Sequence, residues 1–230
     1  MICRPGRGPS RGISRVPSGH WNFLFQMARL SSKRMLEIRI QQHFIDSADL
    51  KYQSAQSLSK PIAAAVQAML ACVTSGGKVL ACGNGSSAAD ALHFAAGFVG
   101  RFERERPELG AIALDGSSAV LTALADDYGF EAVFAKQVRA LGQAGDVLLA
   151  ISTSGDSANL LAAIAAAHER DMTVVALTGR GGGQTGAALG ETDVHVCVPH
   201  ERAARIQEVH GLVLHCICDC VDTQLLGEQE

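Results

Sequence analysis

The chain has 230 residues, of which 47% are hydrophobic and 19% are charged, a length and composition typical of one compact soluble domain with a sizeable core. A formal net charge of −3 argues against direct binding to nucleic acid or to an anionic membrane surface. No uninterrupted apolar run reaches the roughly 18 to 20 residues that a membrane span requires, so we expect no membrane partner.

The first 34 residues differ in composition from the rest of the chain. They carry seven Arg and Lys residues, no acidic residue and half of the six prolines. A secretory signal would need an apolar core of about 7 to 15 residues, which the interrupted run at 21–27 does not supply. We predict that residues 1–34 form a disordered basic extension, with a targeting or interaction tail as the alternative, and that residues 35–230 form the domain.

Helical and strand patterns alternate along residues 35–230. Helical periodicity covers 36–74, and Pro61 is expected to divide it into two helices. Five short apolar runs follow, at 78–82, 111–114, 146–152, 173–178 and 194–198. Helical patterns cover 88–99, 130–141 and 158–170, a weaker one follows Gly181, and a long, largely apolar one covers 203–226. Such runs predict an α/β fold with a five-stranded parallel sheet flanked by helices, and a C-terminal helix buried in the core or a subunit interface.

Two serine-rich loops each follow a predicted strand and open a predicted helix. Their sequences are CGNGSS at 82–87 and STSGDS at 152–157. Backbone N–H groups and the positive end of the helix dipole favour a phosphate at such a place. Because ligands of open α/β sheets bind beyond the carboxyl ends of the strands, both loops are expected to face one crevice. The candidate ligand residues are Asn84, Ser86 and Ser87, which would hold sugar hydroxyls or help the phosphate, and Ser152, Thr153, Ser154 and Ser157, which would hold the phosphate.

The serine-rich loops and the cysteines also have simpler structural roles open to them. Ordinary N-capping is the alternative role of the serines, worth about 1 kcal/mol per helix. Neither loop has a P-loop or a dinucleotide fingerprint, so we expect no nucleotide cofactor. The cysteines are expected to be free thiols in a reducing compartment. Cys216, Cys218 and Cys220 alternate along a predicted helix and point in different directions, which favours core packing over a metal site.

Several segments resemble the SIS-domain phosphosugar-binding proteins, within them the sedoheptulose 7-phosphate isomerases (GmhA) and their relative DiaA, which associates with the initiator DnaA. The resemblance covers about residues 40–226 and rests on GNGSS at 83–87, HF at 93–94, RFERERP at 101–107, GDVLLAISTSG at 145–155, ALTG at 176–179 and RIQEVH at 205–210. It implies a SIS fold and a cytoplasmic homotetramer with active sites at subunit interfaces, assembled through the N-terminal helical region and the C-terminal helix. The implied activity converts sedoheptulose 7-phosphate into D-glycero-D-manno-heptose 7-phosphate, on the way to lipopolysaccharide core heptose.

The resemblance also implies roles for individual residues. His215 matches the catalytic histidine, His93, Gln207 and His215 match a zinc site found in several members, and Gln207, Arg101 and Asp127 match substrate-site residues. The family's catalytic glutamate falls at Gly97, one helical turn after His93. Loss of a positioned base costs about 10²- to 10⁴-fold in rate, so we expect weakened Zn²⁺ binding and impaired isomerisation.

Three functions stay open on these residues. The first is a ketose-phosphate isomerase, since most of the implied site is present. The second is a DiaA-like tetramer that binds DnaA without catalysis, since DiaA also lacks the glutamate. The third is a sugar-phosphate sensor. Among the remaining histidines, His210 is expected to be packed in the core or an interface, and His168, His195 and His200 are expected to be solvated surface residues.

Overall fold

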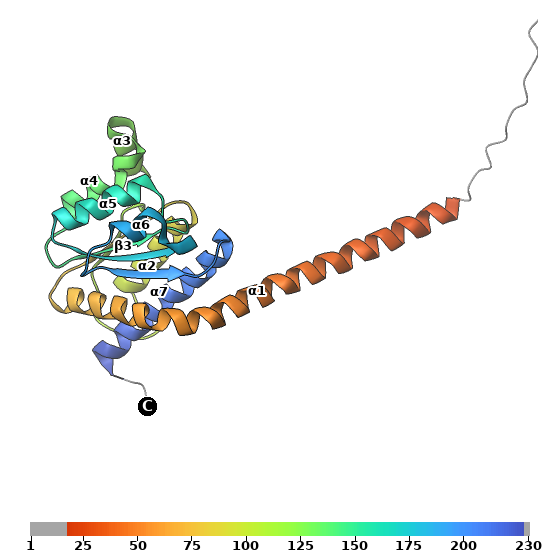
Figure 1. The fold of residues 1–230 in the computed structure, drawn as a ribbon, viewed down its shortest axis with the longest axis horizontal. Coiled ribbons are helices and arrows are strands. Elements are labelled where there is room, and N and C mark those ends of the chain that lie inside the picture. The colour runs from red at the N-terminus through yellow and green to blue at the C-terminus, as the bar shows by residue number, and fades with distance from the viewer. Residues whose placement is uncertain (1–17, 228–230) are drawn as a thin grey trace, which may run out of the picture. The chain divides into compact units, whose positions relative to one another are not determined.

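The computed structural model describes residues 18–227, with side chains described from residue 33 onward (Figure 1). The chain divides into two units, one ending at Ile45 and one starting at Asp46, and each is described by itself. Helix α1 (Ser18–Thr74) runs through both. It begins inside the basic segment, where no helix was expected, while residues 1–17 lie outside the described residues. The division into an extension and a domain at residue 35 stays a prediction.

The prediction that Pro61 divides the N-terminal region into two helices is wrong, because Pro61 lies inside α1. A proline inside a helix removes one backbone hydrogen bond and crowds the preceding turn. Leu58 before it and Ala65 and Val66 after it are all buried in the same core. Burial on both sides of Pro61 therefore keeps the two halves in one helix.

Five strands form one parallel sheet in the order β2-β1-β3-β4-β5, which confirms the predicted five-stranded parallel sheet. They are β1 (Val79–Gly83), β2 (Ala111–Ala113), β3 (Val147–Ile151), β4 (Thr173–Gly179) and β5 (Val194–Val198). Every residue of β1 and β3 is buried, which explains why these strands have continuous apolar runs. The strand order reverses between β1 and β3, so the switch point that binds ligands in such sheets lies there.

Helices cover both faces of the sheet (Figure 1). Along β1, Val79 and Ala81 join a core with α2 (Ser86–Val99), α7 (Ala203–Leu226) and the part of α1 that follows Ile45. Leu80 and Cys82 join a second core with α4 (Val133–Leu141) and α5 (Ala158–Glu169). The predicted burial of the C-terminal helix in the core is thus confirmed.

Shorter elements complete the fold. They are η1 (Phe130–Ala132), η2 (Arg180–Gly182), α6 (Gly183–Ala188) and α3 (Ser118–Tyr128). Helix α3 was not predicted, and none of its residues is buried. In Figure 1 helix α3 projects beyond α4 and α5 at the top of the view.

Within the described part of the chain, α7 and residues 33–74 of α1 are long and apolar enough to cross a membrane by length and composition alone. A core helix of a soluble protein meets the same criterion. Ile206, Val213, Ile217 and Val221 of α7 pack in the first core. This burial accounts for the apolar character of α7 without a membrane.

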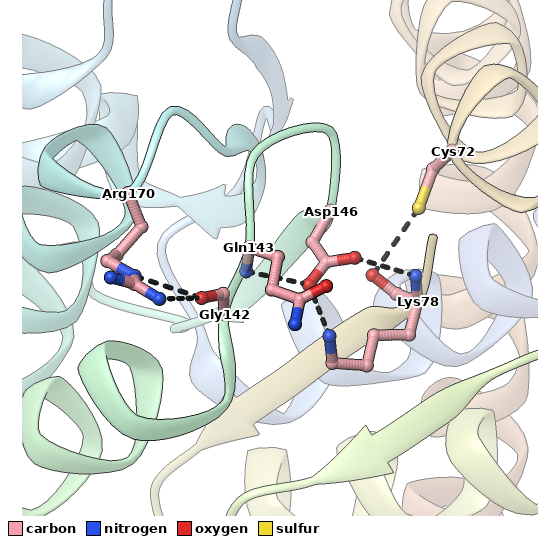
Figure 2. Close-up of polar contacts among 6 residues, drawn as sticks. All are labelled: Cys72, Lys78, Gly142, Gln143, Asp146 and Arg170. Carbon is pink, nitrogen blue, oxygen red and sulfur yellow. Dashed lines mark hydrogen bonds and ion pairs between the residues drawn. The ribbon is translucent and has the colours of Figure 1, made fainter. Parts of the chain in front are cut away.

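A partly buried ion pair joins the amino ends of β1 and β3 (Figure 2). The Asp146 carboxylate accepts hydrogen bonds from the backbone N–H of Lys78 at 2.9 Å, from Lys78 Nζ at 2.6 Å and from the backbone N–H of Gln143 at 2.9 Å. Cys72 donates to the Lys78 carbonyl at 3.4 Å, and Arg170 donates to the Gly142 carbonyl at 2.7 and 2.9 Å. These contacts fix the strand ends that are farthest from the switch point.

Candidate active site

The two serine-rich loops face one small cavity at the carboxyl ends of β1 and β3. The cavity has a volume of about 100 Å³ and is lined by Asn84, Ser86, Ser87, Ile151, Ser152, Thr153, Ser154 and Ser157. All seven loop residues expected to contact a ligand therefore converge. The volume is about three times the share of one water molecule in the liquid, roughly 30 Å³, which suits a phosphate-sized group.

Backbone geometry gives the loops their shape. A Cβ at Gly83 would lie 2.6 Å from the Ser87 backbone, and a Cβ at Gly155, where φ is +75°, would lie 2.1 Å from the Gly182 carbonyl oxygen. Ser152 Oγ accepts a hydrogen bond from the Gly155 N–H at 3.0 Å. Ser157 is the N-cap residue of α5, but its side chain makes no capping hydrogen bond. Its hydroxyl is thus available to a ligand.

Asn84 is tied to a residue that the sequence did not single out. The Asn84 and Asn159 side-chain amides exchange two hydrogen bonds of 2.9 Å, and Asn159 is buried. The pair links the loop after β1 to the first turn of α5. The Asn84 side chain therefore uses two of its hydrogen bonds to hold the two loops together.

A second, larger cavity lies between α2 and α7. Its volume is about 300 Å³, and its lining includes His93, Gly97, Arg101, Phe102, His215 and Cys218. The Nε2 atoms of His93 and His215 lie 3.1 Å apart, so that one ring donates its N–H to the other. The Phe102 ring centroid lies 5.4 Å from that of His215. The resemblance therefore pointed to two histidines that the fold does bring together.

Helix α2 connects the two cavities. Ser86 and Ser87 stand in its first turn, and His93 follows two turns later. At a rise of 1.5 Å per residue, Ser86 and His93 are separated by about 10 Å along the helix axis. A ligand that reached both regions of one helix would be elongated, with its anionic group at one end.

Asp90 is a site candidate that the sequence reasoning missed. It lies three residues before His93 on α2 and is half-buried. Burial raises the pKa of its carboxyl group, while hydrogen bonding from Gln207 and the charge of His93 act in the opposite direction. The signal available in the sequence was its i, i+3 spacing from His93, which places both side chains on one helix face.

A buried ion pair holds the ends of α2 and α7 together. Arg106 Nε donates to Asp222 Oδ1 at 2.6 Å, and both side chains are at most 2% exposed. The same guanidinium donates to the carbonyls of Gly97 at 2.8 Å and Phe98 at 2.9 Å. Arg106 therefore satisfies carbonyl groups near the end of α2, about one turn beyond His93, while Asp222 lies two turns beyond His215.

Two further residues of the implied substrate site lie apart from these contacts. Arg101 is at the rim of the second cavity, with its side chain 61% exposed and its Nη1 3.7 Å from Glu105 Oε1. Asp127 is exposed near the end of α3 and lines neither cavity. Since α3 buries none of its residues within this chain, the single chain does not bring Asp127 to the histidines.

His168 is exposed, as expected, and His195 is only partly exposed, but each has a hydrogen-bond partner. His168 Nε2 lies 2.7 Å from Asp193 Oδ2, and His195 Nε2 lies 2.7 Å from Thr178 Oγ1. Burial lowers the pKa of His195. His210 is packed in the core, which was one of the two places expected for it. Its Nε2 lies 3.0 Å from the Thr178 carbonyl oxygen, and burial lowers its pKa to about 4.

The implied zinc site would draw its ligands from His93, Gln207 and His215. A catalytic zinc ion takes three protein ligands. His93 and His215 offer two imidazole nitrogens, and Gln207 bonds to Asp90. Among the described residues, no group of three or more His, Cys, Asp and Glu residues could hold a metal ion, and burial raises the pKa of the Cys218 thiol to about 12. Zinc binding by His93, Gln207 and His215 stays a prediction from the resemblance, and no step below uses a metal.

The fold and its crevice define a doubly wound α/β protein with a ligand site at the switch point. The SIS domain family model matches residues 43–179. A phosphoheptose isomerase from Methylibium petroleiphilum is 71% identical over 196 residues, which are 85% of this chain and 98% of that protein. One from Dechloromonas aromatica is 57% identical over 189 residues, which are 82% of this chain and 96% of that protein.

Solved structures agree with these matches. The phosphoheptose isomerase GmhA from Neisseria gonorrhoeae has a TM-score of 0.78 and 54% identity, covering 82% of this chain and 99% of its own. A phosphoheptose isomerase from Francisella tularensis also has a TM-score of 0.78, at 47% identity over 80% of this chain and 97% of its own. This chain belongs to the SIS domain family, in the branch that contains the phosphoheptose isomerases.

Proposed function

We propose that this chain isomerises sedoheptulose 7-phosphate to D-glycero-D-manno-heptose 7-phosphate, in the cytoplasm and on the way to lipopolysaccharide core heptose. The observation that carries the proposal is the convergence of both serine-rich loops on one cavity at the switch point. The same helix that begins there carries His93 against His215. The similarity to phosphoheptose isomerases over 85% of the chain supports the choice of substrate.

The residues divide the proposed reaction into binding and proton transfer. Ser152, Thr153, Ser154 and Ser157 hold the phosphate, together with the N–H groups at the start of α5. Isomerisation moves a proton between C1 and C2 through an enediol, so it needs an acid near the oxygens and a base near the carbons. His215 protonates and deprotonates the oxygens, and His93 holds its ring through the 3.1 Å contact.

A second copy of the chain belongs to the proposal. The site residue Asp127 lies on α3, which has no buried residue, and the resemblance implies a homotetramer with sites between subunits. We propose that α3 of one copy contributes Asp127 to the site of another. Zinc held by His93, Gln207 and His215 stays a prediction from the resemblance, which metal analysis of the purified protein tests.

Turnover tests the proposed function. The full chain is incubated with sedoheptulose 7-phosphate, and the aldose product is measured for the natural sequence and for Gly97→Glu. We expect slow turnover by the natural sequence and a gain of about 10²- to 10⁴-fold in the variant, because a carboxylate then stands one turn from His93. Ser154→Ala is the control, and it should raise KM through weaker phosphate binding. No aldose from either protein would refute the proposal.

The DiaA-like alternative is favoured by one specific observation. Among the residues that line the cavity beside His93 and His215, none is Asp or Glu. A protein that binds a partner without catalysis does not need a carboxylate base in this cavity. A pull-down of DnaA with the full chain distinguishes the two functions. Capture of DnaA with no turnover, even after Gly97→Glu, would establish the alternative.

A further inference from the structure

The cavity between α2 and α7 has an unusual donor set for a proton-transfer site. His93 and His215 present ring nitrogens to it, and the Arg101 guanidinium stands at its rim. Its remaining lining is apolar, with Phe94, Phe102, Leu214 and Cys218. Glu105 Oε1 lies 3.7 Å from Arg101 Nη1, but the Glu105 side chain is 83% exposed and is not part of the lining. The lining therefore supplies hydrogen-bond donors and positive charge, without a negative partner.

Gly97 leaves the space in which such a partner would fit. A Cβ built on Gly97 meets only one neighbour within 4 Å, Cys218 Sγ at 3.8 Å. The whole cavity is about 300 Å³, which is about ten times the share of one water molecule in the liquid. A small anion and the reacting end of a sugar therefore fit in it together.

The other acidic group nearby does not fill this space. Asp90 lies on α2 three residues before His93, whereas Gly97 lies four residues after it. Asp90 interacts with Gln207 of α7 and is absent from the cavity lining. The lining within one chain thus contains no carboxylate that could serve as the base of an enediol reaction.

We propose that this cavity binds a small carboxylate from solution, of the size of formate, acetate or bicarbonate, and uses it as the proton-transfer base. This inference rests on the proposed isomerase function. Imidazole and guanidinium N–H groups donate to the bound anion, and charge-assisted bonds of this kind are the stronger ones. The anion would occupy the space that a longer side chain at position 97 would fill.

The proposed proton transfers balance without an oxidant or a reductant. The bound carboxylate takes a proton from C1 while the C1–H electron pair forms the C1–C2 double bond, and the C2 oxygen takes a proton from protonated His215. The resulting carboxylic acid then delivers its proton to C2. The C1 hydroxyl returns its proton to His215 as the C1 carbonyl forms, so both groups are regenerated.

The test measures turnover in a carboxylate-free buffer at constant ionic strength, with sodium chloride replaced stepwise by sodium formate or acetate. Bicarbonate is tested in closed vessels. We expect a saturable rise of about 10²-fold, the lower end of what a positioned base contributes. Acetamide, which has the shape of acetate without its charge, should give no rise.

Two variants locate the effect. Gly97→Leu fills the cavity and should remove the response to carboxylate, whereas Gly97→Glu should be active without it. Gly211→Leu is the matched control, because Gly211 is also a helical glycine, and an added Cβ there meets no atom within 4 Å. At Gly97 an added Cβ meets only Cys218 Sγ, at 3.8 Å. It lies outside the cavity lining and should keep the response.

The outcomes separate this inference from the function on which it rests. If Gly97→Glu is active and the natural sequence ignores every carboxylate, the inference is overturned and the isomerase proposal stands. If neither the natural sequence nor any variant turns over substrate, a binding measurement tests the carboxylate site. ¹³C-labelled acetate is added to each protein, and the line broadening of the acetate NMR signal is measured. Broadening that Gly97→Leu abolishes and Gly211→Leu retains supports the site, and absence of broadening overturns it.

Discussion

Gly83 shows how one missing side chain shapes the serine-rich loop at 82–87. A Cβ there would lie 2.6 Å from the Ser87 backbone, where nothing can move without shifting the start of α2. We predict that Gly83→Ala lowers the free energy of unfolding by about 1 to 3 kcal/mol, as overpacking does, and weakens sugar-phosphate binding. Denaturant unfolding and calorimetry measure the two effects. Gly211→Ala is the control and should raise stability by up to about 1 kcal/mol. Equal stability of Gly83→Ala and the natural sequence would contradict the prediction.

His210 makes the stability of the protein depend on pH. Its pKa in the folded protein is about 4, below its ordinary value of 6.5, because it is buried. The unfolded chain therefore takes up the proton first as pH falls. The stability contribution is complete above pH 6.5 and decreases as pH falls from 6.5 to 4, by about 3 kcal/mol in total.

The variant His210→Gln tests this dependence, since its side chain does not titrate and can still donate to the Thr178 carbonyl. The difference in free energy of unfolding between the variant and the natural sequence should change in favour of the variant as pH falls from 6.5 to 4. A difference that stays constant over this range would contradict the role of His210.

Residues of the site differ in how well the sequence predicts them. Ser86, Ser87 and residues 152–157 follow buried strands and begin helices, so local pattern alone places them at one crevice. Asp90 and Asn159 were missed because their partners, Gln207 and Asn84, are 117 and 75 residues away in the chain. Local patterns carry no information on such distant pairings.

At the scale of elements, the Arg106–Asp222 ion pair holds α2 and α7 together. Removing one partner leaves the other charge buried and unpaired. We predict that Asp222→Asn lowers the free energy of unfolding by about 3 kcal/mol, measured by denaturant unfolding. Glu169→Gln, which removes the partner of Arg139 in an exposed pair, is the control and should leave stability unchanged. Similar effects of the two substitutions would contradict this account.

Burial also decides which elements the sequence predicts. The five strands were found because a strand covered on both faces has a continuous apolar run. Helix α3 was missed because it buries no residue in the chain, so its side chains need not follow a core-facing pattern. The break expected at Pro61 did not occur because core packing on both sides of Pro61 outweighs one lost hydrogen bond.

At the scale of the whole molecule, the proposed sharing of the site between subunits would make activity depend on more than one copy. If Asp127 of one subunit serves the histidines of another, Asp127→Ala and His215→Ala variants should each lack turnover. After unfolding and refolding together, the mixture should recover turnover, because some sites then combine two intact contributions. Each variant refolded alone is the control. No recovery in mixtures that sizing shows to be mixed oligomers would place Asp127 and His215 in the same copy.

The ion pair of Lys78 and Asp146 (Figure 2) lies at the amino ends of the strands. The serine-rich loops lie at their carboxyl ends. The ion pair and the serine-rich loops are therefore separated by the length of the strands. Substitutions near the ion pair can therefore raise thermal stability without changing the residues that contact the ligand. Substitutions in the serine-rich loops can change ligand preference without disturbing the ion pair.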